Sequence, residues 1–158
     1  MSGHFLDTSA LAKLYHHESG SEYVERLVAV RESNTIISRL SLVEMESVLA
    51  IKVRTGELDA GGRELARRRL RADVAQSRIR VGPAIDEGHY RKARILLARY
   101  GLERALRTLD AIQRAVALGL RDFGDFSVFV AADQRLCRAA EDCGLTTVDP
   151  TNPGLVIV

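Results

Sequence analysis

The chain has 158 residues, of which 46% are hydrophobic and 28% are charged, with a net charge of +2. These values are typical of one soluble globular domain that buries a core without disulfides, and they leave little room for a second domain. No segment approaches the roughly 20 apolar residues that a transmembrane helix needs, and the mild charge does not by itself identify a nucleic-acid partner.

Two hydrophobic periodicities alternate along the chain. In chain order, they predict a strand at 4–7, helices at 9–18 and 21–32, a strand at 35–38, helices at 40–55 and 59–77, a strand at 79–82, helices at 86–100 and 105–118, a strand at 127–132, a helix at 133–142 and a strand at 146–148. Gly56, Gly101, Gly119 and Gly144 are expected to end the helices that precede them. This order favours a single α/β domain over residues 1–158, with a mostly parallel sheet covered on both faces.

The beginning of the chain and the cysteines favour a cytoplasmic protein. The first residues, MSGHFLD, contain neither a cationic stretch nor the apolar run of a secretion signal. Cys137 and Cys143 are too few for a secreted disulfide framework and lack the paired spacing of a zinc site. Arginine recurs between residues 63 and 80 and between 91 and 107, a pattern that fits either phosphate binding or an ordinary solvated helix face.

Four acidic residues fall near the predicted carboxyl edge of the sheet. Asp7 ends the first strand, and Asp133 directly follows the strand at 127–132. Ligands of open parallel sheets bind beyond this edge, where the strand order reverses, so both carboxylates face one crevice if their strands are neighbours there. Glu44 lies in the first turns of the helix that leaves the second strand. Asp110 lies near the start of the helix that leads into the fourth strand, and the sequence leaves its distance from the crevice open.

Each acid also has a plain structural explanation. Asp7 and Asp133 can cap the helices that follow them, and Glu44 and Asp110 can stabilise a helix N-terminus. The four acids together are more informative than any one of them alone. Two carboxylates about 4 Å apart repel by roughly 4 kcal/mol at an effective dielectric constant of ~20. Several together need raised pKa values or a divalent cation, and oxygen ligands favour Mg²⁺ or Mn²⁺. Such a cation activates water and stabilises charge on a phosphodiester.

Four segments resemble, in order, the blocks of a PIN domain: FLDTSALAKLY, ISRLSLVEMESVLA, LRTLDAIQRAVALG and FVAADQRLCRAAEDCGL. The pattern covers nearly the whole chain and is most similar to VapC-type toxins of toxin–antitoxin pairs. The resemblance implies a PIN-like three-layer α/β/α sandwich with a mostly parallel sheet of four to five strands. It implies that the acidic positions are Asp7, Glu44, Asp110 and Asp133, and that the polar residues beside them are Thr8, Ser9 and Ser38. Because their blocks match best, Asp7 and Asp110 are expected to bind the metal directly, with Glu44 and Asp133 in support.

The resemblance also implies an activity and partners. The activity is metal-dependent endoribonuclease cleavage, in which metal-bound water attacks a phosphorus of single-stranded or looped RNA. The partners are a second copy of the chain and a cognate antitoxin that blocks the site. One departure is Ala131, where relatives usually carry threonine two residues before the fourth acid. Asp125 could replace that contribution, but it precedes the strand and is expected at the opposite edge.

Other functions fit the motifs less well. A haloacid-dehalogenase-like phosphatase needs a second aspartate where Ser9 stands, a receiver domain needs an acidic pair and a late lysine, and a dinucleotide-binding domain needs a glycine-rich first turn. An RNA-processing PIN nuclease without a toxin role stays open, as does a PIN-like protein-binding module, although the four acids argue against lost catalysis. The middle helices carry more apolar residues than one helix face can bury, and this excess predicts a groove for a partner helix. The residues are Val48, Leu49, Ile51 and Val53.

Overall fold

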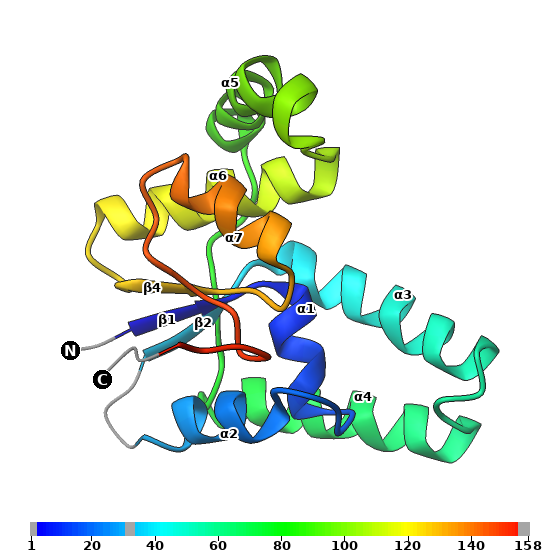
Figure 1. Ribbon diagram of the computed structural model, residues 1–158. Helices are drawn as coiled ribbons and strands as arrows, with labels where there is room; N and C mark the ends of the chain where they lie inside the picture. Colours follow the sequence, from blue (N-terminus) through cyan, green and yellow to red (C-terminus); the bar gives the residue numbers. More distant parts are fainter. Residues whose placement is uncertain (1–2, 31–33, 155–158) are drawn as a thin grey trace.

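The computed structural model describes residues 3–30 and 34–154 (Figure 1). Its sheet has five strands, and all the neighbouring strands are parallel. The strands are β1 Gly3–Leu6, β2 Asn34–Ile37, β3 Arg80–Val81, β4 Val128–Val130 and β5 Thr147–Val148. They are arranged in the order β3-β2-β1-β4-β5. The strand order therefore reverses between β1 and β4, and these two strands are neighbours, as the prediction for Asp7 and Asp133 required.

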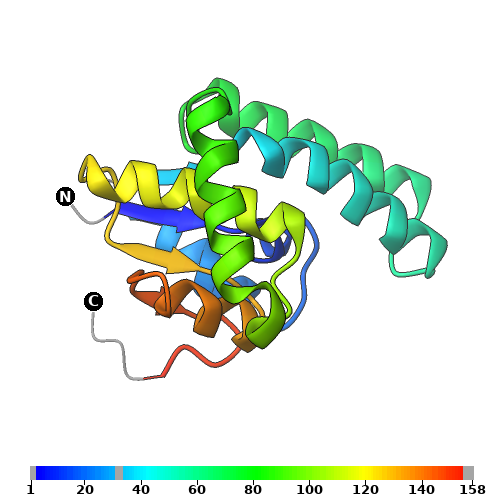
Figure 2. The same ribbon diagram turned by 90° about the horizontal axis from the view of Figure 1, so that it is seen from above.

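Helices cover both faces of the sheet and complete the predicted α/β/α sandwich (Figures 1 and 2). One side holds α1 Thr8–Leu11, η1 Ala12–Leu14, α2 Ser21–Ala29, α3 Arg39–Arg54 and α4 Ala60–Ala75. The other side holds α5 Glu87–Arg104, α6 Thr108–Asp122 and α7 Gln134–Glu141.

The side chains of each strand alternate between the two faces of the sheet, so that each face has its own hydrophobic core. Successive side chains of a strand point to opposite faces. Leu6, Ile37 and Val130 accordingly pack with α1 to α4. The preceding residue of each strand, namely Phe5, Ile36 or Phe129, packs with α5 to α7.

Two glycines do not end helices as predicted. Gly101 lies inside α5, which continues to Arg104 and ends at Ala105 in the left-handed region. The last turn is held against the end of α7, because Tyr100 Oη donates to the carbonyl oxygen of Asp142 at 2.9 Å and Arg104 forms an ion pair with Asp142. Gly119 lies inside α6, and a Cβ there would approach His89 Nε2 of α5 at 4.0 Å. Tertiary packing therefore extends both helices past their glycines.

The first predicted helix is shorter than expected, because α1 passes into η1 and ends by Leu14. Residues 31 and 32 of the helix predicted at 21–32 lie outside the described residues. Gly56, with φ of +78°, follows the end of α3 as predicted. On either side of this glycine, α3 and α4 form a hairpin that projects from the sheet (Figure 2). Within residues 3–30 and 34–154, no helix is long and apolar enough to cross a membrane.

Candidate active site

Asp7 lies between β1 and α1, where it both caps a helix and faces other acids. Its backbone N–H donates to the carbonyl oxygen of Val130 at 2.9 Å, which continues the pairing of β1 with β4. Its Oδ2 accepts hydrogen bonds from the N–H of Ser9 at 3.1 Å and from Ser9 Oγ at 2.8 Å. Ser9 Oγ in turn accepts from the N–H of Ala132 at 3.0 Å. The carboxylate is therefore buried and fixed at the junction of the two central strands.

Glu44 reaches the same region from α3. Thr8 Oγ1 donates to Glu44 Oε1 at 3.0 Å, and Gln113 Nε2 donates to the same oxygen at 2.6 Å. These two hydrogen bonds join the beginnings of α1 and α6 to α3. The position of Glu44 thus depends on residues that are far apart in the sequence.

Asp110, in the first turn of α6, completes a cluster of three interacting carboxylates. Burial is the main reason why the pKa values of Asp7 and Glu44 are raised. The charge of Asp110 raises both pKa values further, and hydrogen bonds from Ser9, Gln113 and Thr8 oppose the shifts. We call Asp7, Glu44 and Asp110 the acidic cluster. The structure thereby places Asp110 beside the other two, a relation that the sequence left open.

Asp133 occupies the predicted edge but makes different contacts. It caps α7, because its Oδ1 accepts from the N–H of Arg135 at 2.7 Å, and its Oδ2 lies 3.4 Å from Arg135 Nη2. Its charge is not among the main causes of the raised pKa values in the acidic cluster. Among the described residues, no three of the four predicted acids bring one oxygen each within 4.8 Å of one another. The electrostatic interactions thus link Asp7, Glu44 and Asp110, and Asp133 stays beside its own helix.

The family model of the PIN domain matches residues 4–142. The chain belongs to the PIN-domain family. Members of this family are nucleases. No curated protein sequence matches the chain.

Solved structures show the same fold at low sequence identity. A chain of the VapBC2 complex from Rickettsia felis, bound to a DNA fragment from its promoter, is 16% identical with a TM-score of 0.60, over 92% of this chain and 96% of that one. A chain of VapBC-1 from nontypeable Haemophilus influenzae is also 16% identical with a TM-score of 0.60, over 94% and 98%. PAE2754 from Pyrobaculum aerophilum is 21% identical with a TM-score of 0.54, over 92% and 83%.

Two buried polar residues of this PIN domain were missed by the sequence interpretation. Gln113 and Arg114 are each 1% exposed. Arg114 Nη1 donates to the carbonyl oxygen of Asp110 and Nη2 to that of Leu136, both at 2.9 Å, and the charge of Arg114 lowers the pKa of Asp7. Spacings of three and four from Asp110 put both residues on its helix face, which could have indicated them.

Of the remaining expected residues, two contact the acidic cluster. Thr8 and Ser9 bind its carboxylates, whereas Ser38 caps α3 through the N–H of Ser41 at 3.1 Å and forms no hydrogen bond with an acid among the described residues. Asp125 lies at the opposite edge, as expected. Its side chain pairs with Arg80, and its carbonyl oxygen accepts from Asn34 at the start of β2.

A second group of ionisable side chains lies away from the acidic cluster. His16, Glu18 and Glu57 bring one ligand atom each within 4.8 Å of one another. Lys52 Nζ, however, donates to Glu18 at 2.9 Å and to Glu57 at 3.0 Å. Lys13 Nζ also pairs with Glu18 at 2.9 Å. Two lysines therefore offset the charges of the two carboxylates, so the group is an ion-pair network that ties α3 to the loop before α2.

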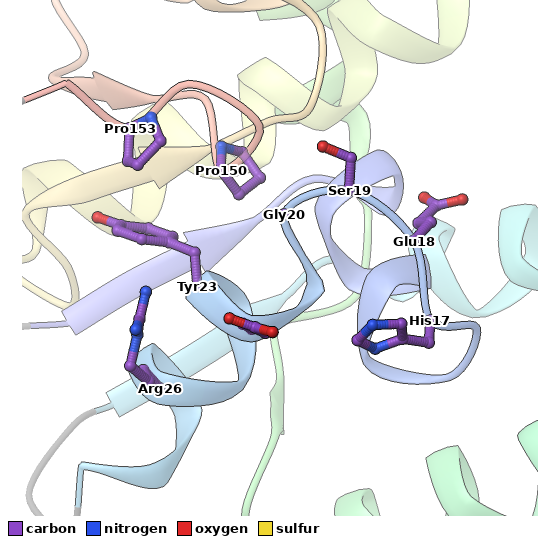
Figure 3. Close-up of a pocket in the computed structure, with 9 residues that line it drawn as sticks. His17, Glu18, Ser19, Gly20, Tyr23, Arg26, Pro150 and Pro153 are labelled. Carbon is purple, nitrogen blue, oxygen red and sulfur yellow. The ribbon is translucent and has the colours of Figure 1, made fainter.

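The surface of the described residues has several hollows, and two of them border α2 and the α3–α4 hairpin. One, of about 510 Å³, lies between the start of α2 and the segment after β5, with Tyr23, Arg26 and Pro153 on its wall (Figure 3). The other, of about 320 Å³, is an apolar groove between α3 and α4, which we call the hairpin groove. Its apolar wall consists of Leu42, Met45, Leu49, Leu70, Val74 and Ala75. A groove on these helices was predicted, but of the four residues proposed for it only Leu49 lines it.

Proposed function

We propose that this PIN domain is a metal-dependent endoribonuclease and the toxin of a toxin–antitoxin pair. The observation that supports nuclease chemistry best is the acidic cluster. Three carboxylates, from the end of β1, from α3 and from α6, interact near the point where the strand order reverses, and burial and mutual repulsion raise the pKa values of Asp7 and Glu44. A cluster that disfavours its own negative charge is suited to a cation.

The side chains fit Mg²⁺ or Mn²⁺. Asp7 Oδ1, Glu44 Oε2 and both carboxylate oxygens of Asp110 accept no hydrogen bond from the described residues, so oxygen donors remain available. Hard divalent cations prefer such ligands. We propose Asp7 and Asp110 as direct ligands, with Glu44 and Asp133 in support. The bound cation supplies Lewis-acid stabilisation and an activated water.

The protein side chains prepare this site. Ser9 holds Asp7 Oδ2, and Thr8 and Gln113 hold Glu44 Oε1, which leaves the second oxygen of each carboxylate available. The charge of Arg114 offsets part of the negative charge of the cluster. These hydrogen bonds hold the carboxylates before any substrate binds, and such prior orientation reduces the reorganisation that a reaction needs.

The arginine-rich stretch between residues 63 and 80 contributes less free positive charge than its composition suggests. Arg63, Arg67, Arg78 and Arg80 all form ion pairs with acidic residues of the chain. Arg39 and Arg107 are exposed and form no ion pair within the described residues, and they stand at the starts of α3 and α6, which carry Glu44 and Asp110. We propose that Arg39 and Arg107 bind RNA phosphates beside the cluster.

The toxin assignment is supported by the hairpin groove and by the fold shared with the VapBC chains. The groove has the apolar wall that an amphipathic partner helix needs. We propose that a segment of a cognate antitoxin binds there, and that the protein forms a homodimer in the cytoplasm. Co-expression with the product of the adjacent gene should give a stable complex with suppressed nuclease activity. A chain that elutes alone and fully active would count against the toxin role.

The nuclease assignment is tested with purified, partner-free protein. It should cleave RNA with Mg²⁺ or Mn²⁺ and stop when EDTA is added, and the matched variant Asp110→Asn should be inactive under both conditions. Undiminished cleavage in EDTA would contradict metal dependence. Equal cleavage by Asp110→Asn would point to a contaminating nuclease.

A further inference from the structure

We propose that Gln113 is a positioning residue for Glu44: it holds one carboxylate oxygen so that the other is available to the metal. This inference rests on the proposed function. It concerns a residue that does not contact the substrate or the metal and acts only through Glu44.

Gln113 lies at the centre of a buried hydrogen-bond network that joins three helices. Its Nε2 lies 2.6 Å from Glu44 Oε1, 2.9 Å from Ser41 Oγ and 3.0 Å from Thr8 Oγ1. An amide nitrogen has two hydrogens, so the three acceptors share them. The contact with Glu44 is the shortest, and a carboxylate is the strongest acceptor of the three. The donor end of Gln113 is therefore directed mainly at Glu44.

The other end of the amide shows that Gln113 is not simply a core-filling residue. Its Oε1 is buried and accepts no hydrogen bond from the part of the chain that the structure describes. A buried acceptor without a partner lowers the stability of the fold. An apolar side chain of similar length would fill the same space without that cost. The contact that only glutamine makes here is the one between Nε2 and the three acceptors, so this contact accounts for its presence.

The network leaves the two oxygens of Glu44 in different states. Oε1 accepts from both Thr8 and Gln113, whereas Oε2 accepts no hydrogen bond from the described residues. With Oε1 fixed, the carboxylate cannot rotate freely about its terminal bond. Partners of this kind, which orient a ligand, typically change metal affinity or activity by about 10–100-fold when they are removed.

The test compares three variants of the full chain. Gln113→Met keeps length and volume but removes the donors, and Gln113→His keeps one ring N–H at similar reach. Thr35→Val is the matched control, because Thr35 is also buried and its hydroxyl has no hydrogen-bond partner among the described residues. Mn²⁺ binding is measured by isothermal titration calorimetry, RNA cleavage gives kcat and KM, and circular dichroism reports folding.

We expect Gln113→Met to bind Mn²⁺ about 10–100-fold more weakly and to lose kcat while KM for RNA stays unchanged. Gln113→His should recover part of both, and Thr35→Val should match the wild type. Unchanged Mn²⁺ affinity in Gln113→Met, an equal loss in Thr35→Val, or a Gln113→Met protein that does not fold would overturn the proposal. If the wild type itself neither binds Mn²⁺ nor cleaves RNA, the proposed function fails and this inference fails with it.

Discussion

The substitution Asp7→Asn distinguishes the effect of the acidic cluster on the stability of the fold from its contribution to catalysis. Asparagine keeps an oxygen that accepts the two hydrogen bonds from Ser9, and it caps helices about as well as aspartate. The substitution removes a negative charge from a residue that is 7% exposed and that interacts with Asp110. We therefore expect metal-free Asp7→Asn to be more stable than the wild type at neutral pH.

The pH dependence gives the sign of this effect. Burial raises the pKa of Asp7, so the folded protein binds a proton there more tightly than the unfolded chain does. The wild type consequently loses stability as the pH rises. The loss begins at the pKa that Asp7 has in the unfolded chain, ~3.9, and is complete above its raised pKa in the folded protein. Asparagine does not titrate. The stability advantage of Asp7→Asn should thus be full at pH 8 and should disappear toward the bottom of this window.

The variant Asp7→Ala shows how much the hydrogen bonds of the Asp7 side chain contribute to the stability of the fold. It loses the helix cap, worth about 1 kcal/mol, and the hydrogen bond from Ser9 Oγ, worth about 1 kcal/mol more. In a domain of this size each 1 kcal/mol changes Tm by roughly 2–4 °C, so Asp7→Ala should melt about 4–8 °C below Asp7→Asn. Both variants should lose about 10²-fold or more in cleavage rate, on the order of 3 kcal/mol of transition-state stabilisation.

The assay is thermal unfolding in EDTA at pH 4 and pH 8, followed by RNA cleavage with Mg²⁺. Mg²⁺ should raise the Tm of the wild type more than that of Asp7→Asn, because a ligand stabilises the state that binds it. The reasoning is refuted if Asp7→Asn melts below the wild type at pH 8 in EDTA, or if it cleaves RNA at the wild-type rate.

Four further substitutions extend the test. Asp133→Asn should lower kcat less than Asp110→Asn, because the Asp133 side chain pairs with Arg135 and is not among the main influences on the acidic cluster. Asp125→Asn should be close to neutral, and an Asp125 as critical as Asp7 would mean that the fourth acid has been misplaced. Arg114→Met should lower the free energy of unfolding in urea by about 3 kcal/mol, because it removes a buried charge beside two acids, and a loss under about 1 kcal/mol would contradict that role. Arg107→Gln should raise KM for RNA and weaken its salt dependence at unchanged kcat, whereas an unaltered salt dependence would show that Arg107 does not bind phosphate.

Local patterns in the sequence determined the helices and strands. They also determined the edge of the sheet at which the acidic residues lie. Apolar runs and helical spacing depend on neighbouring residues alone, so the order of strands and helices was predicted correctly. Asp7 and Asp133 directly follow strands, and parallel strands end at one edge of the sheet. The motifs around the acids pointed to the PIN-domain family, which the match over residues 4–142 shows.

Only the tertiary structure decided which side chains meet. The distance of Asp110 from the other acids depends on how α6 packs, and helix spacing within α6 does not contain that information. Gln113 and Arg114 look like surface residues in the sequence, yet they are buried because Thr8, Ser41, Glu44 and Leu136 supply their partners. Likewise, α5 and α6 continue through Gly101 and Gly119 because contacts with other elements outweigh the modest helix penalty of glycine, about 1 kcal/mol. A polar side chain can be buried only where distant segments complete its hydrogen bonds, and those segments are brought together by the fold.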